Sequence, residues 1–210
     1  MSDLSQLYDA ILVGDAKTAF AVTQTALDEG ADPQSLVVEY MTPAMDEVGK
    51  RFENHEYFVP ELLIAARAMK GALELIRPLL TSSGVEPVGR VVIGTVKGDL
   101  HDIGKGLVAS MLEGGGFEVV DLGVDVSAAA FVEKAKETGA TIIAVSALLT
   151  TTMTGMKAVV DAVTEAGLEG VKVMVGGAPV TQQYADSIGA HGYSNNANAA
   201  VAIARELVAS

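Results

Sequence analysis

The stretch Gly98-Asp99-Leu100-His101-Asp102-Ile103-Gly104 holds two carboxylates, a histidine and two glycines. It follows the mostly β-branched run 91–96, and an apolar helical pattern comes after it. Histidine binds metals readily, and a carboxylate two residues earlier can orient its ring. In an open α/β sheet, ligands are held at the turn that follows a strand. We therefore expect Asp99 and His101 to form a metal-capable pair at a strand end.

Strands and helices alternate from residue 90 onward and are expected to position this stretch. The apolar, β-branched runs predict strands at 91–96, 118–122, 141–146, 172–175 and about 190–193. Amphipathic stretches between them predict helices at 104–113, 128–138, 152–166, 180–187 and 197–208. The strands are almost wholly apolar, as in a parallel sheet covered by helices on both faces. The fold class expected is α/β, with a flavodoxin-like, doubly wound parallel sheet of five strands.

The loops after the strands are expected to meet, because the carboxyl ends of parallel strands share one edge of the sheet. Glycines there let a flat ligand approach the backbone closely, and hydroxyl groups can hydrogen-bond inside a cleft. We therefore expect one binding site, lined by the polar or small-residue loops 98–104, 146–152, 176–179 and 193–197.

Helical periodicity alone marks the first part of the chain. It predicts helices at 4–12, 15–30, from 32 to about 48, and 60–78, which favours an antiparallel four-helix bundle. Asp15 and Asp32 are suited to cap the second and third helices, and Pro43 is expected to kink the third. The stretch 81–89 has the composition of a linker. We therefore expect a helical domain of residues 1–88 and a Rossmann-like domain of residues 89–210.

Several familiar catalytic and nucleotide-binding motifs are missing. Five residues separate Gly98 from Gly104 where a P-loop has four, and no G-x-G-x-x-G fingerprint follows the first strand. A catalytic triad of Ser146 with His101 and Asp99 is disfavoured, because Ser146 lacks the G-x-S-x-G context that would expose its hydroxyl. The loops therefore match none of these catalytic or nucleotide-binding motifs.

Composition narrows the function classes further. The chain has 210 residues, a net charge of −13 and no cluster of basic residues, so we expect no nucleic-acid partner. Half of it is hydrophobic, yet no apolar run approaches the ~20 residues that span a membrane. The chain has no cysteine, which rules out disulfides and cysteinyl metal sites. The first residues, 1–4, lack a basic signal region, so a cytoplasmic protein is expected.

The loop residues together carry a family resemblance. Asp99-x-His101-x-x-Gly104, followed by Ser146-x-Leu148 and then Gly176-Gly177, resembles the signature of cobalamin-binding domains. The preceding helices, with Phe52 and the segment 57–61, are similar to the helical cap of methionine synthase. They are also similar to the small corrinoid proteins of methylamine, methanol and glycine-betaine methyltransferase systems. The resemblance covers essentially the whole chain, so the helical domain is expected to act as a cap.

The resemblance implies roles for individual residues. His101 would replace the cofactor's own nucleotide base as the metal ligand on cobalt, and Asp99 would hydrogen-bond its other ring nitrogen. Thr152 stands where the family normally has a relay serine. Phe52 and Val59 match cap residues that cover the methyl face, with Val59 in place of the synthase's leucine. The implied cofactor contacts are Gly98, Asp99, Leu100, His101, Asp102, Ile103, Gly104, Ser146, Leu148, Thr150, Gly176, Gly177, Ala197, Phe52 and Val59.

The function implied is that of a methyl carrier rather than an enzyme. The cobalt of bound cobalamin would accept a methyl group from a donor-specific methyltransferase and pass it to an acceptor methyltransferase. A reductive activator would complete the system. The first alternative is a cobalamin-dependent sensor, which would need a DNA-binding module. The others are the small subunit of an adenosylcobalamin mutase and a phospho-receiver domain, which needs an acidic pair at the first strand's end.

Simpler structural roles remain open for several of these residues. Asp102 is also suited to cap the helix that follows it, and Ser146, Thr150 and Thr152 to cap the helix after the third strand. Phe52 and Phe58 are also compatible with a place in the core of the bundle.

Overall fold

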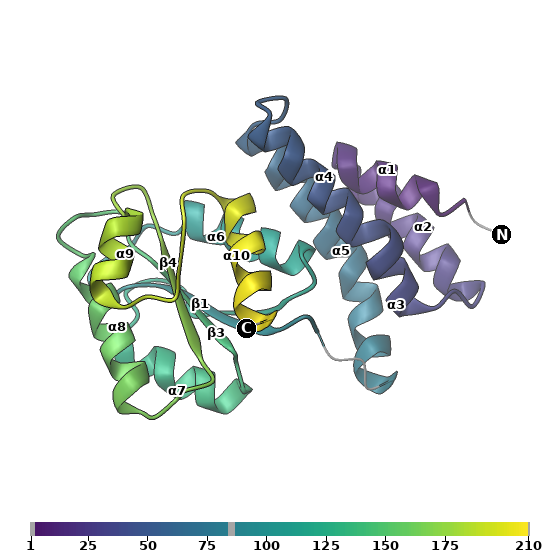
Figure 1. Ribbon diagram of the computed structural model, residues 1–210. Helices are drawn as coiled ribbons and strands as arrows, with labels where there is room; N and C mark the ends of the chain where they lie inside the picture. Colours follow the sequence, from purple (N-terminus) through teal and green to yellow (C-terminus); the bar gives the residue numbers. More distant parts are fainter. Residues whose placement is uncertain (1–2, 84–86, 210) are drawn as a thin grey trace. The chain divides into compact units, whose positions relative to one another are not determined.

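The computed structural model describes residues 3–83 and 87–209, and the chain divides into two compact units (Figure 1). One unit consists of Met1–Pro87 with Glu113–Gly116, and the other of Val88–Leu112 with Phe117–Ser210. Helices build the first unit. A parallel sheet with helices on both faces builds the second.

The helices of the first unit begin largely where the sequence predicts. They are α1 (Ser5–Val13), α2 (Ala16–Asp28), α3 (Pro33–Ser35), the π-helical η1 (Leu36–Met41), α4 (Thr42–Glu53) and α5 (Val59–Ser83). The two predicted N-caps are confirmed, because the carboxylate of Asp15 accepts from the Thr18 amide and that of Asp32 from the Ser35 amide. These caps satisfy amide groups that the first helical turn leaves without partners.

The third helix is irregular in the turn before Pro43. Elements α3, η1 and α4 follow one another without a break, and the Thr42 amide donates to the carbonyl of Val37, five residues earlier. Proline has no amide hydrogen and disturbs the turn that precedes it. The kink expected at Pro43 therefore takes the form of a π-helical segment ahead of it.

The predicted end of the last helix near Pro78 is wrong. Helix α5 continues through this proline to Ser83, so residues 81–83 of the expected linker are helical. A proline removes one hydrogen bond from a helix, and the packing of the buried Leu73 and Ile76 outweighs that loss. The middle of the expected linker, residues 84–86, lies outside the described residues.

The second unit has the predicted sheet. Its strands are β1 (Arg90–Thr95), β2 (Glu118–Asp121), β3 (Ile142–Ser146), β4 (Lys172–Gly176) and β5 (Gly192–Ser194). All are parallel, in the order β2-β1-β3-β4-β5. This is the flavodoxin-like order, so the predicted fold class is confirmed.

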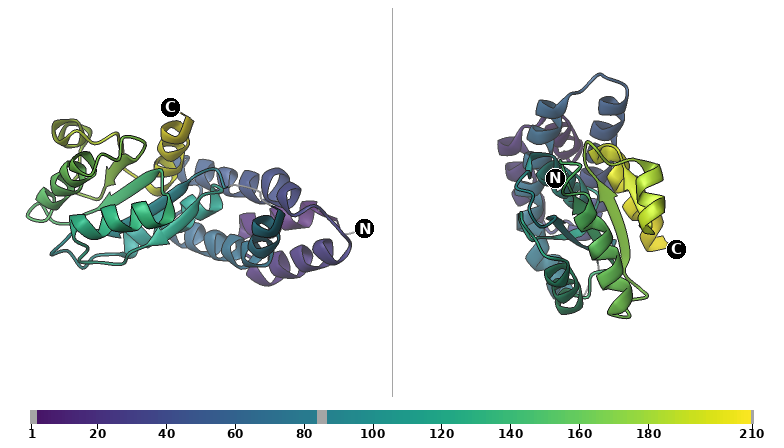
Figure 2. Two further views of the ribbon diagram at one scale, coloured as in Figure 1. Left: turned by 90° about the horizontal axis from the view of Figure 1, so that it is seen from below. Right: turned by 90° about the vertical axis from the view of Figure 1, so that its left-hand side faces the viewer.

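Helices cover both faces of this sheet (Figures 1 and 2). They are α6 (Ile103–Gly114), α7 (Ala128–Thr138), α8 (Thr154–Glu165), α9 (Gln182–Ile188) and α10 (Ala197–Ala209). Helices α7, α8 and α9 share one buried core with the strands, centred on Phe131, Met156 and Val175. In the described part of the chain, no helix is both long and apolar enough to cross a membrane.

The packing of this core predicts that a larger residue at Gly94, in the middle of β1, is destabilising. A Cβ atom at this position would lie 2.8 Å from Cζ of Phe131, which is fully buried. We expect Gly94→Ala to lower the free energy of unfolding by about 1–3 kcal/mol, because overpacking forces side chains off their rotamers. Urea denaturation measures this change. Adding Phe131→Leu should make the combined loss smaller than the sum of the single losses, and additive losses would contradict the explanation.

Candidate functional site

The ends of four neighbouring strands lie in one row. Thr95, Ser146, Gly176 and Ser194 are register partners in that order, from β1 to β5. Because each strand ends at this row, the loops that follow it come together at one edge of the sheet. The sequence predicted this arrangement, which brings Asp99 next to the loop after β3.

The carboxylate of Asp99 joins two of these loops. Its Oδ1 atom lies 2.7 Å from Nδ1 of His101 and accepts the His101 amide at 3.1 Å. Its Oδ2 atom accepts the Leu148 amide at 2.8 Å and the Thr152 hydroxyl at 2.7 Å. The Asp99 side chain is fully buried. Asp99 is therefore the point at which the loop after β1 is fixed to the loop after β3.

Asp99 is ionised at neutral pH despite this burial. Burial by itself would raise the pKa of the Asp99 carboxyl, but hydrogen bonds from the Leu148 amide, the Thr152 hydroxyl and His101 outweigh it. Together they hold the pKa well below its usual range. An ionised carboxylate can only accept hydrogen bonds, so Nδ1 of His101 must carry the proton between the two groups.

This pairing leaves the other ring nitrogen of His101 free to bind. In neutral histidine one nitrogen carries the proton and the other offers a lone pair, so Nε2 is the acceptor here. The His101 side chain is 50% exposed, and its carbonyl accepts the Thr95 hydroxyl at 2.9 Å. A single oriented imidazole suits a metal whose remaining ligands come from a cofactor.

An exposed apolar rim surrounds this pair. The side chains of Leu100 and Ile103 are 72% and 83% exposed, and those of Leu148 and Leu149 are 42% and 44% exposed. Large apolar side chains gathered around a polar centre are typical of a ligand-binding surface. Leu100, Ile103 and Leu148 are residues predicted from the sequence to contact the cofactor. Leu149 lies in the predicted loop 146–152 but was not predicted as a contact itself, and its adjacency to Leu148 was the available signal.

Close packing accounts for the two glycines at the end of β4, Gly176 and Gly177. A Cβ atom on Gly177 would lie 1.9 Å from the carbonyl oxygen of Ala147, and the φ of Gly177, +134°, also favours glycine. A Cβ atom on Gly176 would lie 3.1 Å from the carbonyl oxygen of Ser194. Close packing of the loops thus requires a small residue at both positions, and their contact with a cofactor stays a prediction.

The capping roles considered for the other loop residues are not found. Within the described ranges, the Asp102 side chain makes no hydrogen bond, and its carbonyl accepts the Gly106 amide. Helix α8 begins at Thr154 without a side-chain cap, so Ser146, Thr150 and Thr152 do not cap it. Cofactor contact therefore stays the prediction for Asp102, Ser146 and Thr150, whereas the Thr152 hydroxyl donates to the Asp99 carboxylate.

The remaining predicted contacts of this unit differ in accessibility. Gly98 and Gly104 are exposed, Thr150 is exposed, and Ser146 is half-buried at the end of β3. Ala197 is buried in the first turn of α10, and the adjacent Asn196 caps that helix.

In the helical unit, a fixed turn holds Phe52 and Val59. The Arg51 guanidinium donates to Glu47 at 3.0 Å and to the Tyr57 hydroxyl at 3.1 Å, and it lies 5.3 Å from the centre of the Tyr57 ring. The Arg51 carbonyl accepts the amides of residues 56 and 57. Phe52 is half-buried and Val59 is 43% exposed at the start of α5.

Phe58, beside this turn, is 61% exposed, so the core role considered for it is wrong. Exposed apolar side chains beside Val59 are what a lid over an apolar ligand would offer.

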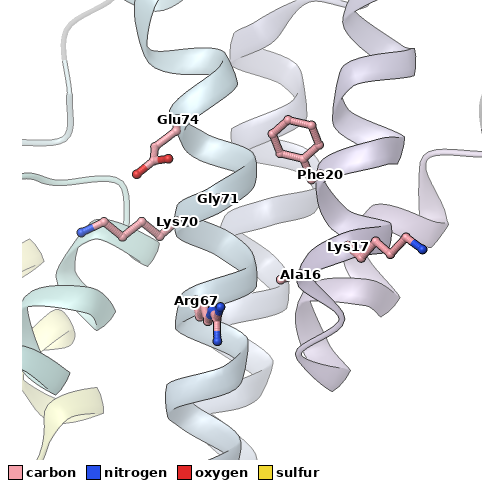
Figure 3. A pocket seen from close by; sticks show the side chains of 7 residues that line it. All are labelled: Ala16, Lys17, Phe20, Arg67, Lys70, Gly71 and Glu74. Atoms are coloured by element: carbon pink, nitrogen blue, oxygen red, sulfur yellow. The ribbon is translucent and has the colours of Figure 1, made fainter.

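A groove between α2 and α5 is a separate feature of the helical unit (Figure 3). It is lined by Ala16, Lys17, Phe20, Arg67, Lys70, Gly71 and Glu74. None of the predicted site residues lines it. Lys17 and Lys70 extend in opposite directions, so these cations do not converge on one ligand position.

The hydroxyl of Thr152 can be tested without any cofactor. Thr152→Val keeps the shape but removes a donor from a buried carboxylate, so it should lower the free energy of unfolding by about 1–3 kcal/mol. Thr152→Ser should retain most of the stability. The neighbouring, exposed Thr151→Val is the matched control and should change it by less than about 0.5 kcal/mol. Equal urea midpoints for the two valine variants would contradict the assigned bond.

Comparison with known proteins agrees with the geometry. Two family models described as B12-binding domains match residues 89–202 and 4–77. The dimethylamine corrinoid protein of Methanosarcina barkeri is 46% identical over 98% of this chain and 97% of its own length. The trimethylamine corrinoid protein 1 of Methanosarcina mazei is 48% identical over 92% of this chain and 91% of its own.

A solved structure extends the likeness to three dimensions. It is the methanol:cobalamin methyltransferase complex MtaBC from Methanosarcina barkeri, one chain of which matches with a TM-score of 0.86 and 30% identity. The match covers 99% of this chain and 80% of that one. The resemblance inferred from the loop motifs is thereby confirmed. The chain belongs to the family of corrinoid proteins built from B12-binding domains.

Proposed function

We propose that the chain carries a methyl group between two partner methyltransferases on the cobalt of a bound corrinoid. The observation that carries this proposal is the buried Asp99 carboxylate, which contacts Nδ1 of the half-exposed His101 in loops that also carry the apolar rim. The family and the methyltransferase complex among its structural relatives support it.

The residues of the site fit such a cofactor. When bound, the corrinoid supplies a cobalt atom that takes up and releases a methyl group. Nε2 of His101 would hold the metal, while Asp99 keeps the proton on Nδ1 and thereby keeps Nε2 available. The exposed leucines and Ile103 would cover apolar parts of the corrin ring and exclude water from the metal.

The buried hydrogen bonds of Asp99 give the site its rigidity. The Leu148 amide and the Thr152 hydroxyl hold Oδ2, so Oδ1 stays directed at the histidine. A fixed carboxylate sets the tautomer and the orientation of the ring it contacts. Thr152 therefore supplies the hydroxyl for which the family normally uses serine.

The chain is proposed to act as one component of a larger system. We infer a donor-specific methyltransferase, an acceptor methyltransferase and a reductive activator as partners, with the chemistry shared among them. A dimethylamine and a trimethylamine relative are nearly equally similar to the chain, so overall identity does not indicate the donor. We infer that the partner methyltransferase selects it. The expected cytoplasmic location stays a prediction.

The ligand role of His101 is tested on protein reconstituted with cobalamin. In the absorption spectrum, the native chain should show the cofactor's own base displaced from cobalt, and His101→Ala should not. Methyl transfer by the variant should fall by about tenfold or more. His55→Asn is the control, because asparagine tolerates the left-handed backbone of His55, at φ +61°, in the helical unit. An unchanged spectrum and rate for His101→Ala would contradict the assignment.

The carrier role makes a separate prediction. The cobalamin-loaded chain, reduced to cobalt(I), is mixed with donor methyltransferases of different specificity, each with its own methyl donor. The cofactor should become methylated with one class of donor only, while the demethylated donor leaves. Adding the acceptor methyltransferase should then return the cofactor to its unmethylated spectrum. Methylation by free donors without any methyltransferase would contradict the proposed division of roles.

A further inference from the structure

The loop between β2 and α7 contacts the loop of residues 98–104, here called the histidine loop because it carries His101. No site residue was predicted from the sequence in the loop between β2 and α7. Asp125, in this loop, has a left-handed backbone with φ +56°, which is uncommon for a residue other than glycine. Its Oδ1 atom accepts the Gly98 amide at 2.8 Å, and its own amide donates to the Asp99 carbonyl at 3.0 Å. Asp125 therefore holds the main chain of the histidine loop at two points, the Gly98 amide and the Asp99 carbonyl.

The same carboxylate also binds a lysine. Its Oδ2 atom lies 2.9 Å from Nζ of Lys97, whose side chain is 67% exposed. Hydrogen bonds from the Gly98 amide and from Lys97 hold the pKa of the Asp125 carboxyl below its usual range. Asp125 is therefore a carboxylate at neutral pH. An exposed ion pair contributes little to stability by itself. The hydrogen bond from the Gly98 amide is therefore the contact through which Asp125 fixes the loop.

Further contacts fix the rest of this loop. The Gly123 carbonyl accepts the Thr95 amide at 3.0 Å. Lys105, whose side chain is 3% exposed, donates to Asp121 at 2.6 Å and to the Gly123 carbonyl at 3.3 Å. The segment 121–125 is thus held to β1 before the histidine loop and to α6 after it. It provides a rigid base from which Asp125 can position the loop.

We propose that Asp125 is a positioning residue of the corrinoid site. Acting through the Gly98 amide and the Asp99 carbonyl, it fixes the main chain that carries Asp99 and so sets how His101 presents Nε2. Gly98 has a φ of +83° and, as glycine, the widest conformational freedom in the loop. Without the Asp125 carboxylate, water replaces it at the exposed Gly98 amide and the loop gains other conformations. The inference rests on the proposed function.

A series of variants separates the contributions of Asp125. Asp125→Gly removes the side chain and tolerates the left-handed backbone, so backbone strain does not confuse the result. Asp125→Asn keeps an acceptor for the Gly98 amide and also tolerates this backbone. Lys97→Met removes the ion pair alone. Thermal unfolding of each variant shows that it is folded before other measurements.

The first readout uses the protein without cofactor. Amide hydrogen exchange, followed by NMR, should speed up on the order of fivefold at Gly98 in Asp125→Gly, because one hydrogen bond is lost. The His101 amide, which bonds to Asp99 and not to Asp125, should speed up as well. Asp125→Asn and Lys97→Met should stay within about twofold of the native rates. An unchanged His101 amide in Asp125→Gly would overturn the inference.

The second readout uses protein loaded with cobalamin at one pH. The fraction of cofactor whose own base is displaced should fall in Asp125→Gly and be restored in Asp125→Asn. An equal fall in Lys97→Met would overturn the inference, because charge rather than position would then be responsible. If the native chain itself does not displace the base, the proposed function fails, while the exchange rates still decide the role of Asp125.

Discussion

The buried carboxylate of Asp99 is the constraint on which the site depends. A charge withdrawn from water is stable only when hydrogen-bond donors surround it. Here the donors come from two loops, with the Leu148 amide and the Thr152 hydroxyl on one oxygen and His101 on the other. Those loops meet only because β1 and β3 are neighbours in the sheet. The doubly wound strand order therefore brings together the groups that fix Asp99, and through Asp99 it orients His101.

Because of this constraint, the residues at this edge of the sheet have different environments and different roles. Asp99 is buried and fixed, His101 is half-exposed and free at Nε2, and the apolar rim is open to a ligand. Because the chain belongs to the B12-binding family, the ligand of this arrangement is a corrinoid. In the proposed function, the protein would contribute orientation and exclusion of water, and the cofactor would contribute the metal.

The sequence predicted much of this, for identifiable physical reasons. Apolar runs mark buried strands, and the spacing of Asp99 and His101 already suggests an oriented metal ligand. The π-helical turn before Pro43 and the passage of α5 through Pro78 depend on tertiary packing, which overrides local preferences. Asp125 was missed for the same reason, because only the folded chain brings its carboxylate to the Gly98 amide.

Ligation of cobalt by His101 is tested most directly by electron paramagnetic resonance of the cobalamin-loaded protein, reduced to cobalt(II). Nitrogen bound to cobalt splits each cobalt line, into a triplet for ¹⁴N and a doublet for ¹⁵N. With ¹⁵N-histidine in the chain and an unlabelled cofactor, we expect doublets, and we expect Asp125→Asn to keep them. Triplets that persist after labelling would show that the cofactor's own base remains on cobalt, and would contradict the role assigned to His101.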